Sequence, residues 1–243
     1  PVTRLAPLIE FESNDKTRKG KQMNINKTIT LSGLAFAVFL PLAASADIHT
    51  IKPGMAGKWN KAESYEENEL PAAGDTIKVR PGEYASGETR DTLSDGGNLA
   101  RVLITKPLRI ESTEGAAKTH IVGGHDATAT GRGENAVRCV AHYGTGGLTL
   151  KGFTLRDGAT SDVTQNAPPS SRGGAVFAWY NQSHPTWVID CVVSNCVSCY
   201  GTLQGVTAIR TLVCDNTAVR YVGSRQCELY NCIFTRNRCD LRK

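Results

Sequence analysis

Five charged residues in the second half of the chain have the side-chain types that acid–base chemistry uses: Arg156, Asp157, Asp190, Asp215 and Arg236. An arginine can neutralise negative charge that develops in a reaction, and an aspartate can accept a proton or help hold a cation. Charged residues beside turns more often form a solvated surface, so that alternative stands beside the catalytic one.

The cysteines carry a second kind of candidate chemistry. Cys196-Val-Ser-Cys199 has the spacing of a redox or zinc half-site, but no second paired motif or suitably spaced histidine accompanies it, and we predict no metal site. Cys191 and Cys232 share a repeat position with small residues, which favours buried free thiols. Disulfides that involve Cys196, Cys199 or Cys214 are the alternative.

Aromatic residues make up only 7% of the chain, so Trp179-Tyr180 stands out. Sugar rings stack on exposed aromatic side chains through their apolar C–H faces, and the pair is a candidate glycan-binding platform. The alternative is that one ring covers the core and the other shields it. The long loop from Ala159 to Arg172 precedes this segment and would wall one side of a groove.

The elements that must position these residues are short β-rich segments that repeat. Four segments align in the second half: 148–158, 187–197, 207–217 and 228–238. In this alignment one apolar column holds Phe153, Val192, Leu212 and Ile233, at spacings of 39, 20 and 21 residues. A later column holds Arg156, Asn195, Asp215 and Arg236, so two of the charged candidates fall in register with Arg156.

Each repeat also opens with its own short strand, at 136–140, 174–178, 201–203 and 219–222. Several short strands in a repeat of 20–25 residues describe one coil of an all-β, single-stranded parallel β-helix. One coil cannot bury its apolar side chains alone, whereas stacked coils pair edge to edge and bury continuous columns.

The chain resembles the right-handed parallel β-helix proteins of the pectin-lyase-like superfamily. The residues that carry the resemblance are Ala73-Gly-Asp-Thr-Ile-Lys-Val-Arg-Pro-Gly-Glu-Tyr84 and Arg101-Val-Leu-Ile-Thr-Lys-Pro-Leu-Arg-Ile110, which leads into His120-Ile-Val-Gly-Gly124. The resemblance covers most of residues 73–239. It implies the fold more strongly than an activity, since this fold hosts lyases, hydrolases, esterases and non-catalytic adhesins.

Lyases of this fold use Arg or Lys to remove an α-proton from a uronate, and calcium held by Asp or Glu neutralises the substrate carboxylate. The resemblance therefore implies a role for the five charged candidates and for calcium only if the protein is such a lyase. Otherwise we expect no cofactor.

The first 46 residues are predicted to serve export and not to belong to the folded domain. Residues 1–22 look like upstream sequence without a fold, and residues 23–46 read as a signal peptide cleaved between Ala46 and Asp47. We therefore expect a protein that is secreted or placed at the cell surface or in the periplasm. The apolar run is too short for a membrane span, and none is expected in the mature chain.

The mature domain is predicted to be residues 47–243, with 47–72 as an N-terminal lead-in or cap and 73–243 as coils. Because no capping pattern precedes Lys243, we expect further coils or a C-terminal anchoring segment beyond it.

Charge excludes one class of partner. The formal net charge is +5, and most of the excess lies in the first 46 residues. A nearly neutral body without a basic run predicts no nucleic-acid partner. We expect a surface or adhesin-like scaffold that contacts extracellular glycans. The alternative is a calcium-assisted polysaccharide lyase, or a related carbohydrate-active enzyme, that acts on acidic polysaccharide.

Overall fold

The structure is a computed structural model, and it describes residues 46–51, 59, 62–67, 69–92, 97–163, 166, 168–179 and 184–240. The segment 1–22 and the signal peptide at 23–46, apart from Ala46, lie outside the described residues, as does Tyr180. Contacts group Ala44–Lys243 into one unit. Two 3-10 helices, η1 (Ala62–Ser64) and η2 (Pro169–Ser171), accompany the strands. Within the described part of the chain, no helix is long and apolar enough to cross a membrane.

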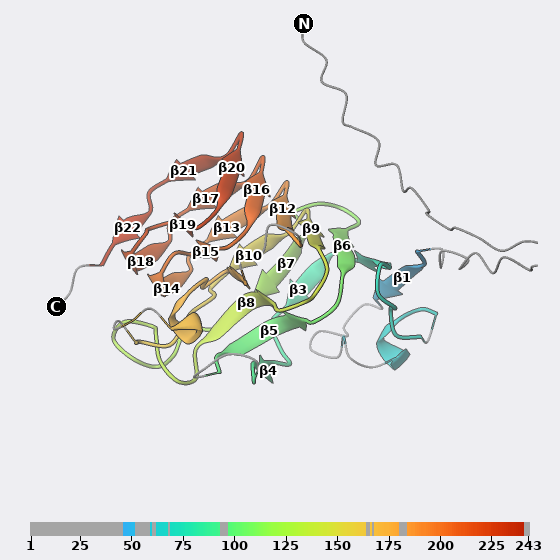
Figure 1. The fold of residues 1–243 in the computed structure, drawn as a ribbon, viewed down its shortest axis with the longest axis horizontal. Helices are drawn as coiled ribbons and strands as arrows, with labels where there is room; N and C mark the ends of the chain where they lie inside the picture. Colours follow the sequence, from blue (N-terminus) through green and yellow to red (C-terminus); the bar gives the residue numbers. More distant parts are fainter. Residues whose placement is uncertain are drawn as a thin grey trace, which may run out of the picture. The chain divides into compact units, whose positions relative to one another are not determined.

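The described fold is all-β, and its strands form four sheets (Figure 1). Sheet A contains, in order, β1 (Ile48–Ile51), β2 (Thr76–Val79), β6 (Leu108–Ser112), β9 (Leu148–Lys151), β12 (Thr186–Ile189), β16 (Thr207–Ile209) and β20 (Glu228–Tyr230). Sheet B contains β3 (Gly82–Tyr84), β7 (Thr119–Val122), β10 (Thr154–Arg156), β13 (Val192–Ser194), β17 (Leu212–Cys214) and β21 (Ile233–Thr235).

Sheet C contains β4 (Thr89–Arg90), β5 (Leu99–Ile104), β8 (Val137–His142), β11 (Val176–Ala178), β15 (Leu203–Gln204) and β19 (Ser224–Arg225). Sheet D contains β14 (Val197–Tyr200), β18 (Thr217–Arg220) and β22 (Arg238–Cys239). All strand pairs in the described residues are parallel except the pair of β4 with β5, which is antiparallel; β5 pairs parallel with β8 on its other side. Parallel strands that recur in the same sheets on each pass of the chain are compatible with the predicted β-helix.

The course of the chain explains the repeats. From β12 onward, each coil visits sheets A, B, D and C in turn, and the next coil pairs with it strand by strand (Figure 1). Trp187 pairs with Thr207, and Thr207 with Glu228, so these coils are 20 and 21 residues long. The predicted spacings of the last two intervals are therefore confirmed.

Within a coil, the strands begin about five residues apart, and the corner between two strands is a residue with positive φ. Asp190, Arg210 and Asn231 occupy the corner between sheets A and B, with φ of 54°, 47° and 54°. The residue after each corner points into the stack, as the burial of Cys191 and Thr211 shows. Each corner is therefore followed by a residue whose side chain points into the core, and the middle residue of the next strand points into the core as well.

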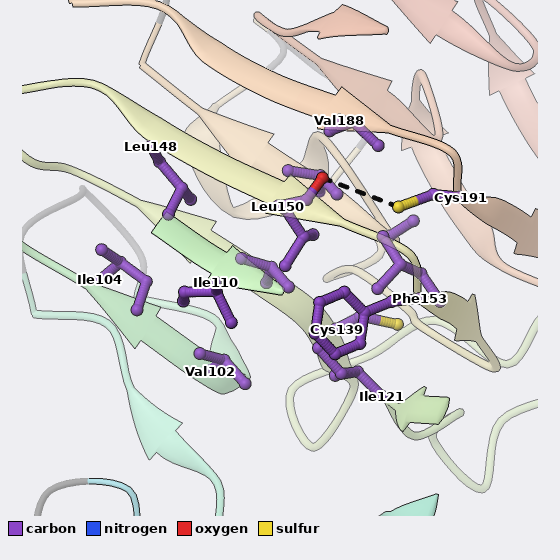
Figure 2. Packing of buried hydrophobic residues seen from close by; sticks show 14 of the residues in the cluster. Val102, Ile104, Ile110, Ile121, Cys139, Leu148, Leu150, Phe153, Val188 and Cys191 are labelled. Atoms are coloured by element: carbon purple, nitrogen blue, oxygen red, sulfur yellow. Dashed lines mark hydrogen bonds between the residues drawn. The ribbon is translucent and has the colours of Figure 1, made fainter. Parts of the chain in front are cut away.

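The hydrophobic core fills the space between the sheets. Figure 2 shows Leu150 of β9 among the core side chains, and the register places it between Ile110 of β6 and Val188 of β12. All three side chains are at most 1% exposed. Like residues thus stack on like residues from coil to coil, as predicted from the apolar columns.

A buried asparagine column fills another part of the interior. Asn216 is fully buried, and its side chain donates to Val193 O at 3.0 Å and accepts from the Cys196 N–H at 2.9 Å. Its Nδ2 also donates to Oδ1 of Asn237 in the next coil, at 3.0 Å. Such a column satisfies backbone groups at the corner, where strand pairing stops.

The structure corrects the first repeat by one residue. Val192 pairs with Thr154, and not with Phe153 as the alignment predicted. The rest of that column is confirmed, because Val192 pairs with Leu212 and Leu212 with Ile233. The physical reason is that Phe153 follows the corner residue Gly152, which has φ of 75°, and is buried, so an apolar match alone took it for a strand residue.

Strand boundaries also differ from the prediction: the strand expected at 201–203 is β15, which begins at Leu203. The strand expected at 219–222 is β18, which ends at Arg220, because Tyr221 has φ of 55° and turns the chain. The lead-in at 47–72 already contains β1, which pairs parallel with β2 over all four residues. Stacking in sheet A therefore begins before residue 73.

Candidate functional site

The charged candidates lie at corners of the coils. Arg156 ends β10 and Asp157 follows it with φ of 58°, while Asp215 and Arg236 occupy the same corner in later coils with φ of 58° and 52°. Because Arg156 pairs with Ser194, the stacked row is Asp157, Asn195, Asp215 and Arg236. The predicted column with Arg156 in place of Asp157 is wrong by one residue, for the reason given above.

Asp190 belongs to a different row, at the corner that precedes sheet B. Each row is held by contacts between coils: Arg210 donates two hydrogen bonds to Asp190, at 2.6 and 2.9 Å. Arg236 donates two to Asp215, both at 2.7 Å. The structure therefore places Asp157, Asp215 and Arg236 in one row and Asp190 in another, at opposite ends of the sheet B strands, while Arg156 is the last residue of β10.

These pairs set the protonation of the groups. Hydrogen bonds from Arg210 and Arg236 hold the pKa values of Asp190 and Asp215 below the usual range for an aspartate. The hydrogen bond with Asp215 raises the pKa of Arg236. The carboxylates thus stay ionised and engaged, and the guanidinium of Arg236 stays protonated. Such rows stabilise neighbouring coils and have little capacity to exchange protons.

The cysteines are free thiols in the structure. Cys191 is buried, and burial raises its pKa to about 12, while Cys232 in the last coil is half-buried. Cys196 and Cys199 make separate contacts: the Cys196 thiol reaches Ser194 O and the Cys199 thiol reaches Ser161 O. Among the described residues, no group of three or more His, Cys, Asp or Glu side chains is arranged to hold a metal ion.

The aromatic candidate lies beside a cavity. Trp179 directly follows β11, its backbone N–H donates to His142 O at 3.3 Å, and the residue is 60% exposed. The ring meets Phe177 edge-on, with centroids 6.4 Å apart. The cavity, which we call the Trp179 pocket, has a volume of about 220 Å³, and its lining residues are Arg172, Phe177, Ala178, Trp179, Gln204 and Gln226. Because Trp179 is so exposed, its ring does not cover the core.

Stacking of coils brings the polar lining together. Gln204 lies in β15, and Gln226 follows β19 in the next coil. The Gln204 amide donates to Gln226 Oε1 at 2.8 Å, and Arg225 Nη1 donates to the side-chain oxygen of each glutamine at 3.0 Å. The network fixes the orientation of both amides at the pocket.

Arg172 is the charged residue in the lining of the Trp179 pocket. It lies at the end of the loop from Ala159, which was predicted to wall a groove, and it reaches this pocket. Its Nε is buried and has no hydrogen-bond partner within the described ranges. Burial, together with the nearby positive charge of Arg225, lowers the pKa of Arg172.

More aromatic and basic side chains adjoin the pocket network. The guanidinium of Arg225 lies 5.5 Å from the centre of the Tyr221 ring, and that of Arg220 lies 5.9 Å from the centre of the Tyr200 ring. The two tyrosine rings are 6.4 Å apart. Sequence reasoning missed these residues and the glutamines. The available signal was the spacing of one coil between Gln204 and Arg225, which are partners in successive strands.

The arrangement can bind a polar ring compound. The exposed indole offers an apolar face, the amides offer donors and acceptors, and the guanidinium offers donors to an oxygen-rich ligand. A scan of protein-family models found no match for this chain, and a search of curated proteins found none either.

Proposed function

We propose that the protein is an exported, right-handed parallel β-helix that contacts an extracellular glycan through the Trp179 pocket. The observation that carries this proposal is the exposed indole of Trp179 at the rim of a cavity lined by two glutamines and an arginine. A sugar presents an apolar C–H face and a ring of hydroxyl groups, so it requires both kinds of surface at once.

The handedness of the fold is part of the proposal. Parallel strands in one sheet are joined by right-handed crossovers in nearly all proteins, and every strand of sheet A from β1 to β20 pairs parallel. The resemblance to the pectin-lyase-like superfamily points to the same hand. A stacked scaffold holds Arg172, Gln204 and Gln226 on separate elements in fixed positions, which suits recognition.

The charged rows favour binding over the lyase alternative. A lyase base must give up its proton before it can take one, and the pairing with Asp215 raises the pKa of Arg236. Asp190 and Asp215 already accept two hydrogen bonds each, so their oxygens are committed. Export rests on the signal peptide predicted at 23–46.

Binding to glycans tests the proposal. The full chain, expressed in an export-competent bacterial host, is titrated with a panel of neutral and acidic oligosaccharides, and Trp179→Ala is compared with it. We expect the substitution to weaken binding by about tenfold or more, because a central aromatic contact commonly contributes over 1 kcal/mol.

The matched control is Tyr230→Ala, which removes an exposed ring outside the pocket and should leave affinity unchanged. Equal affinity of Trp179→Ala and the unaltered protein would refute the proposal. The same panel, incubated with and without calcium, is read for reducing ends and unsaturated uronate. Unsaturated product that disappears with a chelator would establish the lyase instead.

A further inference from the structure

We propose that the Trp179 pocket recognises an anionic substituent of its glycan, a carboxylate or a sulfate, through Arg172. This inference rests on the proposed function and goes beyond it by naming the charge of the ligand. The first observation is Arg172, which lines the pocket and whose buried Nε has no hydrogen-bond partner in the described part of the chain. A charged group with an unpaired buried donor costs free energy, which an anion bound to the guanidinium would offset.

The second observation is that a second positive charge, Arg225, lies near Arg172 and that neither has a neutralising carboxylate among the described residues. Repulsion from Arg225 contributes to the lowered pKa of Arg172, after burial itself. Arg225 donates to two neutral glutamine oxygens and, like Arg172, makes no ion pair with a carboxylate in the regions that the structure describes. None of the six lining residues is acidic.

Several arginines elsewhere on the coils differ in this respect, because they have carboxylate partners: Arg132 pairs with Asp162, Arg210 with Asp190 and Arg236 with Asp215. The sequence around the pocket also lacks acidic residues, with no Asp or Glu from Val163 to Ile189. The sequence neighbours of Trp179 within that range therefore bring no negative charge.

Guanidinium groups bind planar or tetrahedral oxyanions through paired N–H donors, and they do so more strongly than they bind neutral hydroxyls. An acidic sugar that stacks its ring on Trp179 would place its substituent toward Arg172 across the same cavity. Gln204 and Gln226 then remain for the hydroxyl groups. The occupant is thus an acidic saccharide, and the two anion types are separated by the test.

The test compares three probes of similar chemistry: oligogalacturonate for the carboxylate, dextran sulfate for the sulfate, and unmodified dextran as the neutral reference. We expect one acidic probe to bind at least tenfold more tightly than dextran, and its affinity to fall as salt is raised. Arg172→Gln should reduce that preference about tenfold. Arg210→Gln, which removes an arginine paired outside the pocket, should preserve it.

The outcomes separate the two proposals. Acidic probes that bind no more tightly than dextran, or an acidic preference that Arg172→Gln leaves intact, would overturn the anion inference, while the glycan proposal stands if Trp179→Ala abolishes binding. Failure of all three probes to bind would overturn both. If Arg172→Gln does not fold, thermal unfolding of the unaltered protein supplies the same decision: an acidic probe must raise its melting temperature more than dextran does.

Discussion

At the scale of single residues, close approach between coils limits which side chains fit. Gly158 lies between Cys139 of β8 and Cys196, and its N–H donates to the Cys196 sulfur at 3.4 Å. A Cβ atom built on Gly158 would lie 2.1 Å from Gly174 O and 2.9 Å from the Cys139 sulfur. Only glycine allows three coils to approach at this point.

We expect Gly158→Ala to lower the free energy of unfolding by about 1–3 kcal/mol, because backbone of the next coil must move to make room. Thermal or urea unfolding measures the change. Gly124→Ala is the matched control: its Cβ would meet the Val137 side chain at 3.4–3.5 Å, an ordinary contact. The explanation fails if both variants have the stability of the unaltered protein.

Residue types identified Trp179 from the sequence, but they did not identify its neighbours. An exposed tryptophan in a chain with few aromatics is conspicuous by itself. Arg172, Gln204 and Gln226 meet only because coils stack, and isolated polar residues far apart in the chain have no periodic pattern that marks them. The charged candidates were found by type too, yet their partners show that stacking uses them as ion pairs.

At the scale of elements, β1 is attached to the coils by a buried carboxylate. Asp75 is 4% exposed and accepts hydrogen bonds from the Asp47 N–H at 3.0 Å, from the Ala72 N–H and from His49 Nε2 at 3.0 Å. Burial opposes ionisation of Asp75, but these hydrogen bonds outweigh it and lower its pKa below the ordinary 3.8. Glu67 lies 4.0 Å from the other nitrogen of the His49 ring.

A carboxylate whose pKa is lower in the folded state contributes stability above its unfolded pKa and loses it as pH falls through the folded value. We therefore expect Asp75→Asn to destabilise the protein by about 1–3 kcal/mol at pH 7, as for a hydrogen-bonded charge. The difference should shrink below about pH 4, where the unfolded aspartate is protonated.

Unfolding by urea across pH 3–7 measures this difference, with Asp47→Asn at the exposed neighbouring side chain as control. A gap between Asp75→Asn and the unaltered protein that stays constant from pH 7 to pH 3 would contradict the role of the charge.

The strands themselves were largely predictable, and their register was less so. Strand β2 (Thr76–Val79) lies in the segment 73–84 that carried the resemblance, where turn residues flank a short β-branched run on both sides. The alignment failed at Phe153 because the residue after a corner is buried as well as the strand centre, which leaves two buried apolar positions close together after each corner. Sequence alone does not tell which of the two belongs to the strand.

At the scale of the whole domain, the coil is the unit of structure. Thr207 of β16 and Glu228 of β20 are partners in sheet A, so the 21 residues from 207 to 227 make one complete coil. Neighbouring coils interact only through their shared edges and columns. Removal of a whole coil therefore preserves the pairing of those that remain.

We expect deletion of residues 207–227 to give a protein that still unfolds cooperatively with a β-rich circular dichroism spectrum, because Glu228 takes the place of Thr207 beside Trp187. Deletion of 208–227 is the control. It leaves one extra residue, which moves inward side chains to the outer face, and it should abolish cooperative unfolding. Equal behaviour of the two deletions would show that register is not fixed by the columns.

In the oxidising compartment proposed for this protein, the eight free cysteines stay reduced only if folding buries them before they are oxidised. In the unfolded chain every thiol is open to oxidation, whereas burial raises the pKa of Cys191 to about 12 and so suppresses its reactive thiolate once coils enclose it. Stacking and disulfide formation are thus competing reactions. Cys239 is exposed in β22, so its thiol stays accessible after folding, and we expect oxidation of the folded protein to begin there.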